Sequence, residues 1–105
     1  MYFVDVILPL AVKGVYTYSL PTHFTKIDVG FRVIVHFGSK KLYSAIVVKI
    51  HDNEPKNYIA KEVLEIIDVI PIVNQNQIDL WYWISNYYCC TLGEVMSARS
   101  SGVIH

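Results

Sequence analysis

One segment, residues 30–48, limits the possible folds of this chain more than any other, because it reads as two β-strands around a tight turn. In the first run, Val33, Val35 and Phe37 recur at every second position and therefore share one face of a strand. The second run alternates in the same way. Gly38 marks the reversal, because a turn position with positive φ favours glycine. We therefore predict an antiparallel hairpin.

Two lysines, Lys40 and Lys41, follow the reversal and are expected at the exposed rim of the hairpin. Their ammonium groups lie next to backbone that carries no bulky side chain, and this favours contact with phosphate. Lysines at such rims also protect sheet edges against pairing with other strands. Both interpretations stay open for this pair.

Shorter strands are predicted at residues 2–8 and 15–20, each closed by a proline that cannot donate a ladder hydrogen bond. Within the second of these, Tyr16 and Tyr18 face the same way, so both are packing residues if that face is the core. Residues 58–69 fit a helix or a strand by periodicity, and their β-branched content favours a strand.

The apolar spacing changes to that of a helix from residue 76 onward. Asn76 is the predicted cap of this helix, and Asp79 is placed favourably against its dipole. Thr91 is predicted to cap a second short helix.

The chain has 105 residues and is predicted to be one domain, residues 1–105, because it can enclose a single core. Strands precede helices, which indicates an antiparallel sheet or small barrel over about residues 1–73 and a helical tail over about residues 76–98. Hydrophobic residues make up 53%, so we expect a partner or neighbouring domain to cover some apolar surface. No apolar run can span a bilayer and no signal sequence is evident, so we expect a cytoplasmic location without a membrane partner. The natural chain is expected to continue beyond His105.

No catalytic or metal site is predicted from the residues. Cys89 and Cys90 are adjacent, and neither they nor the four histidines show the spacing of metal ligands. The sequence contains no phosphate-binding loop motif and no evident Ser/His/Asp, Cys/His or paired-carboxylate constellation. We therefore expect no cofactor in this fragment.

Charges are divided unevenly although the formal net charge is zero. Residues 1–50 contain six Lys and Arg against two Asp, whereas residues 51–105 contain three against seven Asp and Glu. Such polarity suits a local anionic ligand and does not suit a protein that coats a long duplex.

Five motifs in a fixed order are similar to those of one known family. They are LPL at 8–10, YTYSLP at 16–21, GFRVIVHFG at 30–38, LEIID at 64–68 and WISNYYCCTLGEV at 83–95. With them the chain resembles, over nearly its whole length, the N-terminal DNA-binding domain of the primosomal protein N′ family, the replication-restart helicases PriA. The resemblance implies a mainly β (α+β) fold, a small OB-like antiparallel β-barrel with a C-terminal helical tail.

The resemblance also implies a function, the binding of the 3′-hydroxyl end of single-stranded DNA, as on the nascent leading strand at a stalled fork. The implied parent is a bacterial, nucleoid-associated, ATP-dependent 3′-to-5′ DNA helicase. Its ATP, magnesium and zinc sites are expected outside this fragment. The implied protein partners are the helicase lobes of the same chain and other primosome proteins.

Four residues match the positions that line the family's pocket for the terminal nucleotide: Tyr16, Thr17, Gly38 and Lys61. The resemblance implies that Tyr16 stacks on a base, that Gly38 lets the nucleotide approach the main chain, and that Lys61 supplies charge for the last phosphate. The family commonly has Asp where this chain has Thr17, so a neutral hydroxyl replaces a strong acceptor. Without the resemblance, the residues alone favour a packing role for Tyr16 and a solvated Lys61.

Two other hypotheses for the function come from different classes. In one, the domain is a non-catalytic interaction module that contacts helicase lobes or primosome proteins through an aromatic patch of Trp81, Tyr82, Trp83 and Tyr87. In the other, the chain is a small independent enzyme, which the lack of an evident catalytic constellation disfavours.

Overall fold

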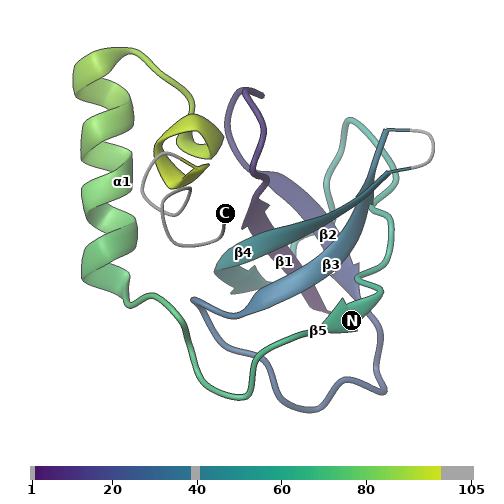
Figure 1. Cartoon of the computed structure of the whole chain (residues 1–105). Helices are drawn as coiled ribbons and strands as arrows, with labels where there is room; N and C mark the ends of the chain where they lie inside the picture. Colours follow the sequence, from purple (N-terminus) through teal and green to yellow (C-terminus); the bar gives the residue numbers. More distant parts are fainter. Residues whose placement is uncertain (1, 39–40, 98–105) are drawn as a thin grey trace.

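The computed structural model describes residues 2–38 and 41–97, in which a sheet lies beside a helical layer (Figure 1). The elements in chain order are β1 (Tyr2–Ile7), β2 (Tyr16–Leu20), β3 (Arg32–Phe37), β4 (Lys41–His51), β5 (Glu65–Ile66) and α1 (Gln75–Tyr88). Residues 92–97 form a further helical segment. The prediction of a mainly β fold with a C-terminal helical part is confirmed.

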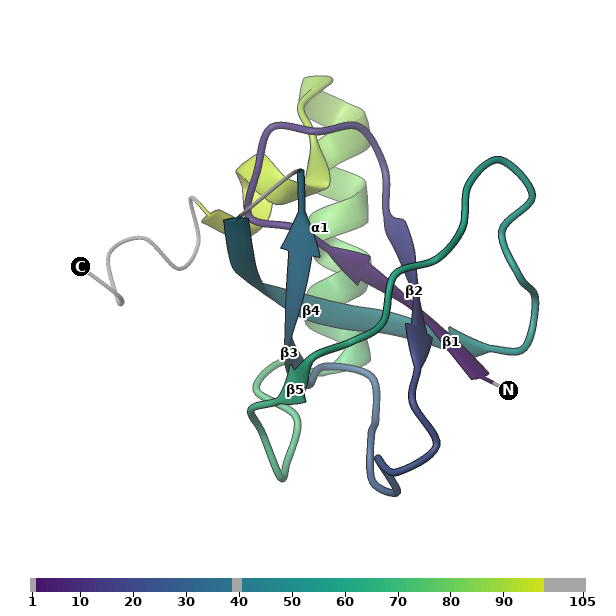
Figure 2. The same cartoon turned by 90° about the vertical axis from the view of Figure 1, so that its right-hand side faces the viewer.

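The five strands form one antiparallel sheet in the order β2-β1-β4-β3-β5. Within the described residues this sheet is not closed into a complete barrel, and its two edges meet through an isolated bridge between Ser19 and Glu62. There the Ser19 amide donates to the Lys61 carbonyl (2.8 Å) and the Val63 amide donates to the Ser19 carbonyl (2.9 Å). Figure 2 shows the chain after β4 looping out and returning across β2 before it reaches β5. The predicted barrel is thus an open, OB-like sheet.

The hairpin predicted for residues 30–48 is present as β3 and β4, in which Val33 pairs with Ala45 and both are fully buried. Gly38 follows β3 with a φ of +76°, as expected for glycine at the reversal. The next two residues, among them the predicted site residue Lys40, lie outside the described residues.

Both faces of the sheet are covered by apolar side chains. Val4 and Val6 of β1 join Tyr18 of β2 in the core that the sheet encloses. Ile7 belongs to a second core, where it packs with Trp81 of α1 and with the helical segment 92–97. Alternation along one strand therefore supplies two separate cores.

The helical segment 92–97 packs closely on the chain that leaves β1. A Cβ atom on Gly93 would collide with the carbonyl oxygens of Leu8 and Leu10, so this approach requires glycine. The LPL motif and the glycine of the last motif therefore contact each other.

The start of α1 differs from the sequence prediction. The helix begins at Gln75 and its cap is Asn74, so the prediction of Asn76 as the cap is wrong. Asn74 Oδ1 accepts from the Gln77 amide (2.9 Å) and Gln77 Oε1 accepts from the Asn74 amide (2.8 Å), which satisfies two free donors at once. Asp79 lies beyond the first turn and accepts from Gln75 Nε2 (2.9 Å).

Two further sequence predictions concern the second half of the chain. Thr91 caps the segment 92–97 as predicted, because its Oγ1 accepts from the Glu94 amide (3.1 Å) while Glu94 Oε1 accepts from the Thr91 amide (2.9 Å). The stretch 58–69, for which periodicity leaves helix or strand open, is extended and contains β5.

Asp68 fastens the chain after β5 onto β3. Its two carboxylate oxygens accept from Arg32 Nη2 (2.8 Å) and Nε (3.1 Å), and Oδ2 also accepts from the Arg32 amide (2.8 Å). These bonds to the guanidinium hold the pKa of Asp68 below its usual value and raise the pKa of Arg32.

Candidate nucleic-acid interface

A pocket of about 230 Å³ lies beside the open edge of the sheet. Three segments that are distant in sequence form its wall: β2, the end of β3 with the following glycine, and the chain after the β4 loop. The lining residues are Tyr16, Thr17, Tyr18, His36, Phe37, Gly38, Tyr58, Ile59 and Lys61. Small-molecule sites on other folds are built in the same way, from a few polar groups on a mostly apolar wall.

The structure brings together four of the six predicted site residues, since Tyr16, Thr17, Gly38 and Lys61 all line this pocket. Lys41 is exposed at the start of β4 and is not among the lining residues. The predicted phosphate contact of Lys41 therefore stays a prediction outside the pocket.

Tyr16 and Tyr18 share one face of β2, but they differ in burial. Tyr18 is 4% exposed and its hydroxyl donates to the His36 carbonyl (2.6 Å), so it is a core residue. Tyr16 is partly buried, and its ring meets the ring of Phe37 edge-on, with centroids 4.9 Å apart. The side chain of Tyr16 thus lies at the border between the core and the pocket. Its ring packs against Phe37 and can also stack on a ligand in the pocket.

The pKa of the Tyr18 hydroxyl is raised by its surroundings in the pocket wall. Burial raises the pKa of Tyr18 to about 12, and repulsion from Tyr58 and then Tyr16 adds to the rise. The Tyr18 hydroxyl is therefore within electrostatic reach of both other phenols, and it stays uncharged at neutral pH.

Lys61 and Gly38 are joined across the mouth of the pocket. Lys61 Nζ donates to the Gly38 carbonyl at 3.4 Å, a long bond that leaves the other ammonium hydrogens available. No heavy atom lies within 4 Å of the position that a Cβ on Gly38 would take. The main chain here is open to a ligand, next to a positive charge.

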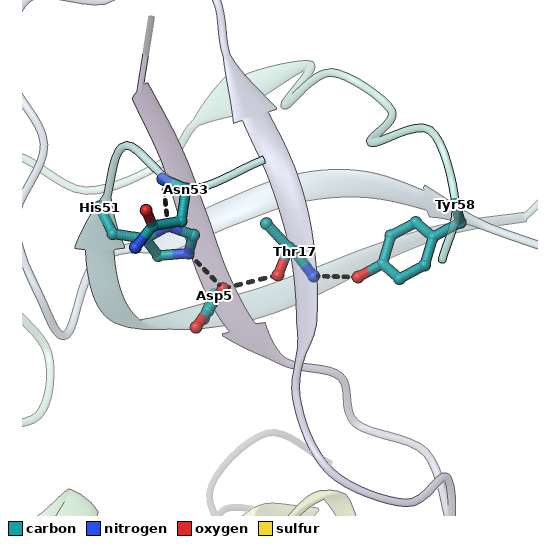
Figure 3. A network of polar contacts seen from close by, with 5 residues as sticks. All are labelled: Asp5, Thr17, His51, Asn53 and Tyr58. Carbon is teal, nitrogen blue, oxygen red and sulfur yellow. Dashed lines mark hydrogen bonds and ion pairs between the residues drawn. The ribbon is translucent and has the colours of Figure 1, made fainter. Parts of the chain in front are cut away.

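The side chain of Thr17 points away from Tyr16, as alternation along a strand requires. Its Oγ1 donates to Asp5 Oδ1 (2.7 Å), which directly faces it on β1. Figure 3 shows this bond within a network of Asp5, Thr17, His51, Asn53 and Tyr58. The hydroxyl hydrogen of Thr17 is thus already used inside the protein.

The same carboxylate also orients His51. Asp5 Oδ1 lies 2.8 Å from His51 Nε2, and the Asn53 amide donates to His51 Nδ1 (3.0 Å). Because an amide N–H only donates, Nδ1 must accept, and we assign the ring hydrogen to Nε2, directed at Asp5. The first residues of the β4–β5 loop are in this way tied to β1.

The middle of that loop is tied to β2 by Tyr58, a residue that the sequence does not single out. The Tyr58 hydroxyl accepts from the Thr17 amide at 2.9 Å, across 41 positions of sequence. The alternation that predicts the hairpin puts Phe37 on the inner face of β3, but no local pattern places Tyr58 or Ile59 at the pocket.

The aromatic patch proposed on α1 is incomplete. Trp81 is 6% exposed and packs into the second core, so its predicted place in that patch is wrong. Trp83 and Tyr87 are more than half exposed, and their rings stack with centroids 5.0 Å apart. Residues separated by four positions on a helix lie on the same face, which explains this stack.

Metal sites and membrane-spanning helices are both absent from residues 2–38 and 41–97. No group of three or more His, Cys, Asp or Glu side chains is arranged there to hold a metal ion. No helix in this part of the chain is long and apolar enough to cross a membrane.

Comparison with known proteins relates this chain to one family. A family model for the 3′DNA-binding domain (3′BD) of PriA matches residues 5–100. The chain is 28% identical over all of its 105 residues to the replication restart protein PriA of Buchnera aphidicola subsp. Acyrthosiphon pisum (strain APS). It is also 28% identical, over a match of 90 positions that covers 82% of the chain, to the replication restart protein PriA of Bacillus subtilis (strain 168). The matched regions span 14% and 11% of those relatives' lengths.

Proposed function

The chain belongs to the family of PriA 3′DNA-binding domains, and from this premise we propose that its pocket captures the terminal nucleotide at the 3′-hydroxyl end of single-stranded DNA. The observation that carries the proposal is the arrangement of Tyr16, Thr17, Gly38 and Lys61 around one pocket. These residues come from three separate segments. Each segment carries one group for one part of a nucleotide: the Tyr16 ring for the base, the Gly38 backbone for the sugar and the Lys61 ammonium for the phosphate.

The chemistry of the wall suits a strand end. A tyrosine ring can stack on any base, a contact worth about 1–3 kcal/mol that tolerates different bases. The Lys61 ammonium can pair with the last phosphate, and the open backbone at Gly38 lets the sugar approach. At about 230 Å³ the pocket is smaller than the roughly 300–1,000 Å³ of sites that enclose a drug-sized ligand. It therefore suits one unit of a strand.

The wider role is inferred from the relatives. Because the matched relatives are replication restart proteins about seven times longer than this chain, we infer that the domain is the N-terminal module of a longer helicase. In that setting it would hold the nascent leading strand at a stalled fork, and ATP, magnesium and zinc would act in other parts of the parent. The module itself binds and does not catalyse.

Fluorescence anisotropy with short oligonucleotides tests the proposal. Strands ending in 3′-hydroxyl should bind better than strands ending in 3′-phosphate, with shallow salt dependence because few phosphates are contacted. We expect weak binding overall, since one stacked base and one or two phosphates must offset the entropy of association. Tyr16→Ala should abolish the preference, and Tyr16→Phe, which keeps the ring, should retain it. Equal binding of both ends by the unaltered chain would contradict end capture.

A second candidate function rests on the exposed rings of α1. Trp83, Tyr87 and Tyr88 are each more than half exposed, and such apolar area is commonly covered by a partner. This supports an interdomain or protein–protein contact on the side of the sheet where α1 lies (Figure 1). If neither oligonucleotide binds measurably, the DNA-binding function is excluded for this chain and the interaction function is retained.

A further inference from the structure

Tyr58 occupies a place in the pocket wall that neither the sequence pattern nor the resemblance assigns. It stands in the middle of the loop between β4 and β5, 44% exposed, next to the 91% exposed Ile59. Both side chains line the pocket together with Lys61. An isoleucine so exposed beside a tyrosine leaves an apolar surface open to any ligand that enters.

Tyr58 is held in place by a hydrogen bond to β2, a strand at the edge of the sheet. β2 is an edge strand, so amides on its outer side need partners from elsewhere in the chain. The Ser19 amide donates to the Lys61 carbonyl, while the Ser19 carbonyl accepts from the Val63 amide. The Thr17 amide donates to the Tyr58 hydroxyl at 2.9 Å (Figure 3). The Tyr58 bond, together with the two bonds at Ser19, thus holds the β4–β5 loop against β2 beside the pocket.

The bond to the Thr17 amide uses the Tyr58 hydroxyl as an acceptor only. A phenol accepts and also donates, and towards Thr17 the oxygen of Tyr58 accepts. No acceptor for its hydrogen is found among residues 2–38 and 41–97. The neighbouring hydroxyls differ, because Tyr18 donates to the His36 carbonyl and Thr17 donates to Asp5.

We propose that the Tyr58 hydroxyl donates a hydrogen bond to an oxygen of the bound terminal nucleotide while it continues to hold the Thr17 amide. The acceptor is a carbonyl oxygen of the base or the oxygen at the 3′ position. This inference rests on the proposed function, since it names a contact made by the same site. It makes Tyr58 a direct ligand contact as well as a part of the wall.

A double-mutant cycle between protein and DNA tests this contact. Tyr58→Phe and the unaltered chain would be titrated with three oligonucleotides: one ending in thymidine, one ending in 2′,3′-dideoxythymidine, and one ending in a nonpolar thymine isostere without carbonyl oxygens. For the thymidine end we expect about a three- to ten-fold loss of affinity, typical of one hydrogen bond. The loss should be clearly smaller for whichever end lacks the accepting oxygen, because only the part that comes from the broken Thr17 bond is common to all three ends.

Tyr2→Phe is the matched control, because Tyr2 is 60% exposed and does not line the pocket. It should bind all three oligonucleotides like the unaltered chain. An equal loss for all three ends in Tyr58→Phe would mean that the hydroxyl only positions the loop, and this would overturn the inference, as would no loss at all. If instead the unaltered chain does not distinguish 3′-hydroxyl from 3′-phosphate, the proposed function itself has failed.

Discussion

Lys61 Nζ lies 3.4 Å from the carbonyl oxygen of Gly38 and so closes one side of the pocket with a charge that has no carboxylate partner among residues 2–38 and 41–97. If this ammonium meets the last phosphate, Lys61→Gln should weaken binding of a 3′-hydroxyl strand several-fold. It should also reduce the slope of log affinity against log salt by about 0.7, the value for one phosphate contact on a single strand. Anisotropy titrations at several salt concentrations measure both quantities.

Lys26→Gln provides the comparison for that experiment. Lys26 is exposed and lies outside the pocket wall, so its removal changes the net charge equally without touching the site. An identical change of slope in both variants would show that general charge, and not the position of Lys61, attracts the DNA.

Alanine substitutions at Gly38 and Gly14 can separate an effect on folding stability from an effect on DNA binding. Both have positive φ, +76° and +78°, and neither has an atom within 4 Å of its missing Cβ. Alanine at either position should therefore cost a similar amount of folding free energy, about 1 kcal/mol, from backbone strain alone. Urea unfolding of the two variants measures this cost.

Binding should distinguish the two glycine variants. Only Gly38 lines the pocket, so Gly38→Ala should also weaken DNA binding, while Gly14→Ala should leave it unchanged. Equal affinities for the two variants would argue against a close approach of the nucleotide to the main chain at Gly38.

Local alternation explains what could be predicted from the sequence. Val33, Val35 and the reversal at Gly38 are set by neighbours in the chain, and they are found where the pattern places them. The shared face of Tyr16 and Tyr18 follows from the same rule, but the rule does not tell which of the two is buried. That depends on where the enclosed core ends, which is a property of the folded sheet.

Contacts between distant segments explain what could not be predicted. The bond from the Thr17 amide to Tyr58 spans 41 positions, and the bridge from Ser19 to Glu62 spans a similar distance. The start of α1 is a different case, because the local sequence does contain a signal for the correct cap. Asn74 is followed three residues later by Gln77, which completes a capping box, whereas Asn76 is followed at that spacing by Asp79.

Tyr18 should make the stability of the domain fall at alkaline pH. Its pKa is about 12 in the folded state against 10.0 for the free side chain, so the unfolded chain loses the proton first. The contribution is complete below pH 10 and is lost as the pH rises from there to about 12. Tyr18→Phe removes this dependence together with the bond to the His36 carbonyl.

Urea unfolding at pH 8 and pH 11 measures the effect of Tyr18. The difference in unfolding free energy between the unaltered chain and Tyr18→Phe should shrink at the higher pH. Tyr87→Phe, in which an exposed ring on α1 loses its hydroxyl, should show no comparable change. A constant difference across this range for Tyr18→Phe would mean that its phenol is not shielded as the structure indicates.

Asp68 should make stability fall at acid pH. Hydrogen bonds from Arg32 hold its pKa below the usual 3.8, so on acidification the unfolded chain takes up the proton before the folded one. The contribution is complete above that usual value and is lost as the pH falls through the lowered pKa. Asp68→Asn should therefore destabilise the domain at pH 7 and differ less from the unaltered chain at pH 2.5. Asp52→Asn, at an exposed loop position, should be nearly neutral at both. A difference for Asp68→Asn that does not shrink on acidification would show that packing of this residue, and not the charge of its carboxylate, fastens the chain after β5 to β3.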